Sequence, residues 1–272
     1  MSVWINGRAG TTVHWNDRGL QYGDGLFETM RIRGGAVRLL DFHLDRLAAG
    51  CRVLALKAPA RRVLEREIAR AASRHRSGVA KLILTRGPGM RGYRPTGRER
   101  CTRILSTQPL PASPAARDTD AVRIRVCSTC MGANVRLAGL KTLNRLESVL
   151  ARAEWSDARI WEGLMPDADG NLVSGTMSNL FVRRGTRIMT PLLDRCGVAG
   201  VMRRWILESA GTLGLHAQER RLRWRDLCEC DEAFMSNAVV GIRSVATFER
   251  GRERIRLGAF DAAARLRALL DA

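Results

Sequence analysis

Short apolar runs alternate with segments of helical periodicity along the N-terminal part of the chain. The run VWING predicts a strand that ends in an Asn-Gly hairpin turn, and Gly34-Gly35 separates two further apolar runs. A helical pattern follows, with Asp41 as the expected N-cap. The pattern predicts strands at 3–7, on both sides of Gly34-Gly35 within 26–40, at 79–87 and at 101–108, and helices at 41–56 and 60–76.

The same alternation continues after residue 120, with more strands than helices. The pattern predicts a strand at 121–127, hairpins at 163–175 and 179–191, two strands within 232–249, and helices at 144–155, 197–214 and 257–272. One face of the first of these helices is apolar and consists of Leu146, Val149, Leu150 and Ala153. We therefore expect a second α+β unit.

A stretch rich in proline and small residues, TQPLPASPAARDTDA at 107–121, separates the two halves. Such a composition suits an extended connection between domains. We predict an N-terminal α+β domain at 1–108, a linker at 109–120 and a C-terminal domain at 121–272.

The composition indicates a soluble globular protein. Hydrophobic residues make up 45% of the 272 positions, and no apolar run approaches the ~20 residues that a membrane-spanning helix needs. The start, MSVWINGRAG, lacks the charged and then apolar layout of a secretory signal. We therefore expect a cytoplasmic protein with no membrane partner.

The seven cysteines are an odd number and lie scattered, which favours reduced thiols over a disulfide framework. The motifs CSTC at 127–130 and CEC at 228–230 together offer four thiolates, the number typical of structural zinc. The second pair lacks the usual two-residue spacer. We predict no metal ligand and keep zinc binding as an alternative.

The formal net charge of +19 is of the kind that nucleic-acid-binding proteins carry. The arginines are nevertheless spread over the whole chain, and aromatic residues, at 5%, offer few platforms for stacking bases. A small anionic substrate is the partner that we expect. A basic protein that binds zinc or nucleic acid is the alternative from a different class.

Lysine is rare in this chain. Of 46 basic residues only Lys57, Lys81 and Lys141 are lysines. Arginine stays protonated in proteins, whereas lysine can lose its proton and become a nucleophilic amine. Lys141, which precedes the predicted helix at 144–155, is therefore the first candidate for covalent chemistry.

A lysine that forms a Schiff base with pyridoxal phosphate needs a phosphate cradle, a partner for the ring nitrogen, and groups that anchor the substrate. The segment GVAGVMRR at 197–204 places glycines before a predicted helix, whose first N–H groups can receive a dianion. A plain tight turn explains the same glycines equally well.

Seven motifs bring a resemblance into view: DRGLQYGDGLFETMR, FHLDRL, KLILTRGPGMRGYRP, LAGLKTLNRLESVLARAE, GNLVSGTMSNLFV, GVAGVMRR and EAFMSNAVVGIRSV. In this order and spacing they resemble the fold-type-IV pyridoxal-phosphate enzymes, which include branched-chain and D-amino-acid aminotransferases and 4-amino-4-deoxychorismate lyases. The resemblance spans nearly the whole chain. LKTLNRLESVLAR, with GMRGY upstream, is most similar to the lyases.

The resemblance implies a fold, an activity and an assembly. It implies a smaller N-terminal α/β domain and a larger C-terminal domain with a β-barrel-like core, with the active site between them. The implied reaction converts 4-amino-4-deoxychorismate to 4-aminobenzoate and pyruvate, in folate biosynthesis. The implied assembly is a homodimer. An aminotransferase of the same fold and a non-catalytic relative are the alternatives.

The resemblance also implies roles for individual residues. Lys141 matches the Schiff-base lysine that shuttles protons, and Arg46 matches the arginine that binds the cofactor phosphate. Further phosphate contacts are implied for Val201 and Met202 at the helix start, and for Asn237 and Ala238 in a loop on the other side.

The substrate contacts are less closely specified by the motifs. Arg91 in GMRGY and Arg31 in FETMR match positions that can meet substrate carboxylates. Thr29 and Asn144 are candidates for orienting nearby groups.

One position departs from the family. Ser174 stands where the family has a glutamate that pairs with the protonated pyridine nitrogen of the cofactor. A neutral hydroxyl only shares a hydrogen bond, so we expect the ring to stay unprotonated. This weakens the aminotransferase reading, because a transaminase stores carbanion charge in the ring. The lyase reading tolerates it better, because its product ring becomes aromatic.

Overall fold

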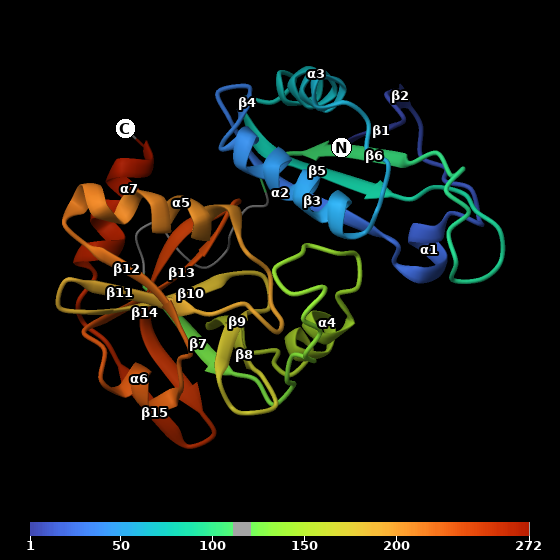
Figure 1. The fold of residues 1–272 in the computed structure, drawn as a ribbon. Coiled ribbons are helices and arrows are strands. Elements are labelled where there is room, and N and C mark those ends of the chain that lie inside the picture. Colours follow the sequence, from blue (N-terminus) through green and yellow to red (C-terminus); the bar gives the residue numbers. More distant parts are fainter. Residues whose placement is uncertain (111–120, 272) are drawn as a thin grey trace. The chain divides into compact units, whose positions relative to one another are not determined.

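The computed structural model describes residues 1–110 and 121–271 of the chain (Figure 1). The chain divides into two compact units. The first unit contains the N-terminal half and, from the second half, the segment Leu140–Asn144; the second unit contains the remainder. The predicted linker at 109–120 lies almost wholly outside the described residues, so the domain boundaries stay predictions.

The first unit is built on a six-stranded sheet in the order β2-β1-β6-β5-β3-β4. Its strands are β1 (Ser2–Ile5), β2 (Arg8–Ala9), β3 (Gly25–Arg33), β4 (Ala36–Val37), β5 (Ser77–Thr85) and β6 (Thr102–Gln108), and its helices are α1 (Arg18–Tyr22), α2 (Leu40–Val53) and α3 (Arg61–Ala72). All neighbouring strands are antiparallel, as the sequence pattern predicts.

Strand alternation divides this sheet into two different faces. Leu26, Met30 and Ile32 on β3 are buried, and α2 and α3 pack on the same face of the sheet (Figure 1). Phe27 and Thr29 point to the other face, because successive side chains in a strand alternate. One face of β3 therefore builds the core, and the other carries the polar candidates.

Two local features explain the ends of these elements. Asn6 and Gly7 have positive φ values of 52° and 81° between β1 and β2, which confirms the predicted Asn-Gly turn. The prediction that Asp41 is an N-cap is wrong. Helix α2 begins at Leu40, and its N-cap is Leu39, which has a φ of 58°. Asp41 lies in the first turn of the helix, where its negative charge interacts favourably with the helix dipole.

The second unit is built on a nine-stranded sheet, with the path β12-β11-β10-β13-β14-β7-β8-β9 and β15 paired to β14. Its strands are β7 (Val122–Val126), β8 (Ile160–Pro166), β9 (Leu172–Gly175), β10 (Asn179–Arg184), β11 (Arg187–Pro191), β12 (His216–Arg220), β13 (Glu232–Asn237), β14 (Gly241–Arg250) and β15 (Glu253–Arg256). β9, at the end of the path, contacts β10 and β11, so the sheet curls back on itself.

Helices flank this curled sheet. They are α4 (Leu146–Arg152), α5 (Val201–Ser209), the 3-10 helix η1 (Ala210–Leu213), α6 (Trp224–Cys228) and α7 (Asp261–Asp271). α5 packs on β13, and α7 packs on β13 and β14 (Figure 1). The α+β fold class with a barrel-like second unit is therefore confirmed.

The apolar face predicted for the helix at 144–155 exists, but it is exposed. α4 spans only Leu146–Arg152, and its Leu146, Val149 and Leu150 are 77%, 61% and 62% exposed. Three apolar side chains at i, i+3 and i+4 thus form a stripe that the second unit does not bury. No helix within the described part of the chain is long and apolar enough to cross a membrane.

Candidate active site

Lys141 belongs to the first unit through a short stretch of strand-like pairing. The amide of Phe27 donates to the Lys141 carbonyl at 3.0 Å, Leu143 N–H donates to the Gly25 carbonyl at 3.1 Å, and Thr142 bridges Leu26. The Lys141 Nζ lies 4.2 Å from the centroid of the Phe27 ring. Both the backbone and the amine of the lysine are therefore positioned against the start of β3.

A buried cluster on the opposite face of β3 contains Glu28, His43 and Arg46. The Glu28 carboxylate is 1% exposed and His43 is fully buried. His43 Nδ1 donates to Glu28 Oε2 at 2.5 Å, Arg46 Nε donates to Glu28 Oε1 at 2.8 Å, and a second Arg46 nitrogen donates to Oε2. His43 and Arg46, on consecutive turns of α2, thus both bond the Glu28 carboxylate on β3.

Charge and burial act in opposite directions within this cluster. Burial opposes ionisation of Glu28, but the charge of Arg46 and the hydrogen bond from His43 outweigh it, so the pKa of Glu28 is lowered. Burial lowers the pKa of His43, and Arg46 and Lys141 lower it further against the opposing effect of Glu28. The cluster therefore holds an ionised carboxylate beside a neutral imidazole and an arginine.

Thr29 and Arg31 lie on the same face of β3 as Phe27, and the amine of Lys141 lies against the Phe27 ring. Arg31 donates to Ser77 Oγ at 3.3 Å. Asn144 follows Lys141, and its side chain fills the space over Gly23. The first unit thus contains four predicted site residues. Thr29 and Arg31 lie on β3, and Lys141 and Asn144 lie on the segment that runs beside the start of β3.

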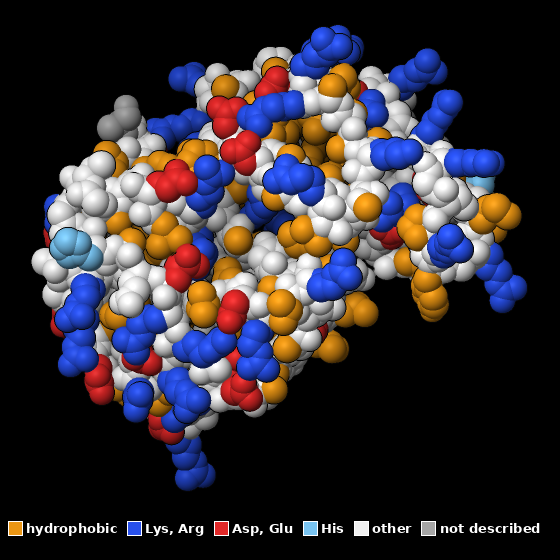
Figure 2. Space-filling model, in the orientation of Figure 1, with side chains coloured by type: hydrophobic (Ala, Val, Ile, Leu, Met, Phe, Trp, Pro, Cys, Tyr) orange, Lys and Arg blue, Asp and Glu red, His pale blue; other side chains and the backbone are white. Residues whose placement is uncertain are grey.

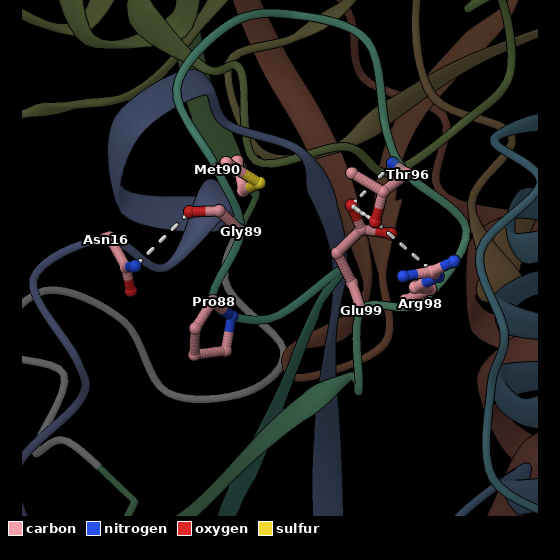
Figure 3. A pocket seen from close by; sticks show the side chains of 7 residues that line it. All are labelled: Asn16, Pro88, Gly89, Met90, Thr96, Arg98 and Glu99. Carbon is pink, nitrogen blue, oxygen red and sulfur yellow. Dashed lines mark hydrogen bonds between the residues drawn. The ribbon is translucent and has the colours of Figure 1, made fainter.

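Arg91 lies apart from these residues, in the exposed loop that follows β5. This loop lines an open pocket of about 650 Å³, formed by Asn16, Pro88, Gly89, Met90, Thr96, Arg98 and Glu99 (Figure 3). The Glu99 carboxylate accepts bonds from the Thr96 amide and hydroxyl and from Gly97, which lower its pKa to about 2. No predicted cofactor residue lines this pocket, and Glu99 serves to hold the loop.

In the second unit, the start of α5 forms a cradle of backbone groups. Gly197 has a φ of 88°, a conformation that suits glycine, and the loop 197–200 is fixed by reciprocal bonds with Gly139 at 3.0 Å. Val201 and Met202 are the first residues of the helix and are buried. Their N–H groups belong to the first turn of a nine-residue helix, where an anion is favoured.

Asn179 locks this cradle from β10. Its Nδ2 donates to the Val198 carbonyl at 2.9 Å, and a Cβ added at Gly200 would collide with its Oδ1. Asn179 is 5% exposed. A side chain larger than hydrogen at residue 200 would therefore displace either Asn179 or the helix start.

Ser174 is buried on β9, and its hydroxyl donates to the Gly175 carbonyl at 3.0 Å. Glu162 on the adjacent strand β8 is also fully buried, beside Gly175. Its oxygens accept from Thr176 Oγ1 at 2.6 Å, Ser178 Oγ at 2.7 Å, Gly163 N at 3.0 Å and Met177 N at 3.1 Å.

Three of these donors, Thr176, Met177 and Ser178, commit Glu162 to the turn between β9 and β10. Burial raises the pKa of Glu162, and the four hydrogen bonds only partly oppose that effect. The buried carboxylate on the strand next to Ser174 is therefore not free to replace the missing glutamate. At position 174 the second unit presents a hydroxyl, as the sequence indicates.

Asn237 ends β13, and its Oδ1 accepts the amides of Val239 and Val240, both at 2.9 Å. Its side chain thus stabilises a local turn, and this turn shapes the loop that contains Ala238. Any contact from this loop to a cofactor would come from the backbone.

All seven cysteines are free thiols. Burial raises the pKa of Cys127 and Cys230 to about 12, which keeps them protonated. Within residues 1–110 and 121–271, no group of three or more His, Cys, Asp or Glu side chains is arranged to hold a metal ion. Figure 2 shows Lys and Arg side chains interspersed with acidic and apolar ones on the face drawn.

Sequence reasoning missed Glu28, His43, Glu162 and Asn179. A signal existed for two of them. His43 and Arg46 are three residues apart on one helix, and Glu28 occupies a position on the apolar face of β3, so a buried ion pair was foreseeable. For Glu162 and Asn179 the partners are hydroxyls and backbone groups, which leave no pattern in the sequence.

Comparisons with known proteins identify the family of this chain. The family described as amino-transferase class IV matches residues 25–248. The aminodeoxychorismate lyase of Vibrio harveyi is 33% identical over 252 residues, which cover 93% of each chain. The D-alanine aminotransferase of Bacillus licheniformis is 24% identical, covering 92% of this chain and 89% of that protein.

Among solved structures, the 4-amino-4-deoxychorismate lyase of Pseudomonas aeruginosa superposes with a TM-score of 0.91 at 42% identity. The superposition covers 98% of this chain and 97% of that one. The family match extends from the start of β3 to β14 and so covers most of the sequence. This chain is therefore an enzyme that belongs to the class IV aminotransferase family.

Proposed function

We propose that this enzyme is a pyridoxal-5'-phosphate-dependent lyase that converts 4-amino-4-deoxychorismate to 4-aminobenzoate and pyruvate. The observation that supports it most strongly is the 42% identity to the Pseudomonas aeruginosa lyase over 98% of the chain. The geometry of Lys141 supports a covalent role. Its amine lies on an aromatic ring, and strand-like hydrogen bonds fix the backbone on either side of it.

Each unit contains groups of the kind that this cofactor binds. In the first unit, Lys141 would provide the amine for a covalent bond to the cofactor aldehyde, and Arg46 a cation for a phosphate. In the second unit, the first N–H groups of α5, at Val201 and Met202, would provide neutral donors for a dianion. At Gly200 there is no room for a side chain because Asn179 fills that space and so fixes the start of α5.

When bound, pyridoxal phosphate supplies an aldehyde for the substrate amine and a ring that withdraws electrons from it. The amine of Lys141 would act as the general base at the substrate carbon that carries the nitrogen. The Lys141 ammonium then gives a proton to the departing enolpyruvyl group. The C–O bond breaks, pyruvate leaves, and the remaining ring becomes aromatic.

The assay that tests this proposal supplies 4-amino-4-deoxychorismate to the pyridoxal-phosphate-loaded protein and measures both products. We expect equal amounts of 4-aminobenzoate and pyruvate. Protein that binds the cofactor but releases neither product would overturn the lyase assignment.

Aminotransferase activity is the second candidate, favoured by the similarity to the D-alanine aminotransferase. Ser174 argues against it, because a hydroxyl does not keep the ring nitrogen protonated. An amino donor such as D-alanine or L-valine, added without a keto acid, distinguishes the two. A transaminase converts its cofactor to the amine form, whereas the lyase leaves the visible absorption band in place.

The same proposal includes a homodimer and a cytoplasmic location. The exposed stripe of Leu146, Val149 and Leu150 on α4 supports a protein partner, and a second copy of the chain is the partner that we propose. Seven free cysteines support a reducing compartment. Leu150→Glu is expected to shift the protein from dimer to monomer in light scattering; an unchanged mass would exclude α4 from the interface.

A further inference from the structure

His43 is a completely buried histidine that uses only one of its two ring nitrogens. Its Nδ1 bonds Glu28 Oε2 at 2.5 Å, and among residues 1–110 and 121–271 its Nε2 has no hydrogen-bond partner. An unpaired buried acceptor lowers stability, and an apolar side chain of similar volume would avoid that loss. The bond to Glu28 is therefore the contact that explains a histidine at this position.

Glu28 in turn fixes the plane of the Arg46 guanidinium. Arg46 Nε donates to one oxygen of the carboxylate and Nη2 donates to the other, a side-on pair that an ammonium group cannot form. A guanidinium has five N–H groups, and this pair directs the remaining three away from Glu28. The carboxylate thus sets the direction in which Arg46 presents its charge.

Of these three side chains, Arg46 is the one that reaches the edge of the buried interior. It is 13% exposed, whereas Glu28 is 1% exposed and His43 is not exposed at all. A ligand that approaches the cluster can therefore contact the guanidinium. Glu28 and His43 can act on such a ligand only through Arg46.

The cluster and the covalent lysine are held by consecutive residues of one strand. Phe27 contacts Lys141 through its ring and through its amide. Glu28 is the next residue on β3 and carries the pair with Arg46. The charge of Lys141 also contributes to the lowered pKa of His43, so the amine lies within electrostatic range of the cluster. Because β3 pairs with β5 along its whole length, this arrangement is rigid.

We propose that Glu28 and His43 are positioning residues for the phosphate of the cofactor. They hold the Arg46 guanidinium in the orientation that meets the phosphate, and they do not contact the ligand themselves. This inference rests on the proposed function, which gives Arg46 to the phosphate, and it adds the two residues that fix its direction. Glu28 cancels part of the positive charge, so the gain in affinity comes from orientation: a side chain ordered before binding loses less conformational freedom.

The test changes the contacts that orient the guanidinium. His43→Leu removes the bond to Glu28 at similar volume, and His43→Asn keeps an N–H donor near the position of Nδ1. Arg46→Lys keeps the charge and removes the side-on pair. His75→Leu is the matched control, because His75 also bonds one side chain of the first unit, Thr107 Oγ1 at 2.8 Å, outside the cluster.

The readouts are the dissociation constants of pyridoxal phosphate and of pyridoxal, which lacks the phosphate, and the phosphorus NMR resonance of the bound cofactor. The ratio of the two constants measures what the phosphate contributes. We expect His43→Leu and Arg46→Lys to reduce this contribution about tenfold, as for one lost charge-assisted hydrogen bond, with pyridoxal binding within about threefold of the wild type. Both should shift the phosphorus resonance. His43→Asn should restore most of the ratio, and His75→Leu should leave it unchanged.

A wild-type ratio in His43→Leu would overturn the inference. Equal losses of affinity for both ligands would also do so, because they indicate a purely structural role, and so would a loss in His43→Asn as large as in His43→Leu. Arg46 is partly exposed, so Arg46→Lys is expected to fold and tests the orientation even where His43→Leu does not fold. The expected ratios in a protein that releases no 4-aminobenzoate would support this inference and contradict the lyase proposal, so the two can fail separately.

Discussion

Glu28 in the first unit and Glu162 in the second are both almost completely buried, and they differ in what surrounds them. Glu28 faces Arg46 and the imidazole of His43 and has a lowered pKa. Glu162 faces only hydroxyls and backbone amides, and burial raises its pKa. Four neutral donors thus compensate a buried carboxylate less well than one arginine and one histidine do.

The difference shows how each unit prepares its part of the chemistry. Glu28 is surrounded by two charged or ionisable partners on α2, whereas Glu162 is surrounded by neutral donors close to the start of β10. Glu28 bonds Arg46, and Glu162 accepts hydrogen bonds from the turn that positions Asn179. Both carboxylates are therefore bound in hydrogen bonds within their own unit.

Removing the charge of Glu28 is expected to have the largest effect on stability. Glu28→Gln removes the buried carboxylate that both Arg46 and His43 bond, a change that costs about 3–5 kcal/mol. Urea unfolding measures this loss. Glu65→Gln is the matched control, because its ion pair with Arg61 on α3 is solvent-exposed and contributes about 0.5 kcal/mol or less. Equal losses in both variants would contradict the account of the cluster.

Glu162→Gln is expected to cost less, about 1–3 kcal/mol, because an amide still accepts some of the four hydrogen bonds. The larger consequence is functional. The turn at 175–178 loosens, Asn179 loses its fixed position, and the affinity for pyridoxal phosphate falls more than that for pyridoxal, which lacks the phosphate. Fluorescence titration with both ligands measures the ratio. A ratio equal to that of the wild type would separate Glu162 from the cradle.

The two glutamates should also give opposite pH dependence. The pKa of Glu28 is lowered from 4.5, so its stabilisation is complete above that value and is lost as pH falls through the lower folded pKa. His43 acts in the same direction below 6.5, because its folded pKa is also lowered. The raised pKa of Glu162 does the reverse, and its cost is relieved as pH falls toward 4.5.

Unfolding free energies between pH 7 and pH 3 test these signs. Relative to the wild type, Glu28→Gln should lose stability less steeply in acid, and Glu162→Gln more steeply. Parallel curves for the two variants would show that their buried carboxylates do not differ in ionisation.

Ser174→Glu is expected to have a specific effect on the reaction. It places a carboxylate at position 174, which favours a protonated ring nitrogen in the bound cofactor. We expect about a tenfold faster conversion of the cofactor to its amine form with an amino donor, corresponding to ~1.4 kcal/mol. Ser174→Ala is the control and should show no gain. An equal rate in Ser174→Glu and the wild type would remove Ser174 from the account of specificity.

Much of this architecture could be predicted from the sequence because strand alternation and helical periodicity report burial directly. β3 and α2 emerged in this way, and so did the glycine-rich entry to α5. The shorter elements α1, α6, β12 and β15 were missed, since segments of four or five residues carry too little periodicity.

The predicted apolar face of α4 illustrates a different limit. Its spacing is helical, but a sequence does not say whether the partner is the same chain, and here the stripe is exposed. The site was predictable where residue type alone carries the chemistry, as at Lys141. It was not predictable where partners come from distant segments, as for Glu162 with Ser178.

The most direct test of the central claim is to find the residue that holds the cofactor. The pyridoxal-phosphate-loaded protein is reduced with borohydride, digested, and analysed by mass spectrometry for the phosphopyridoxyl group. We predict the modification at Lys141, with Lys57 and Lys81 unmodified, and no stable adduct in Lys141→Ala. An adduct at Lys81 instead, or undiminished labelling of Lys141→Ala, would contradict the assignment of Lys141 as the covalent lysine.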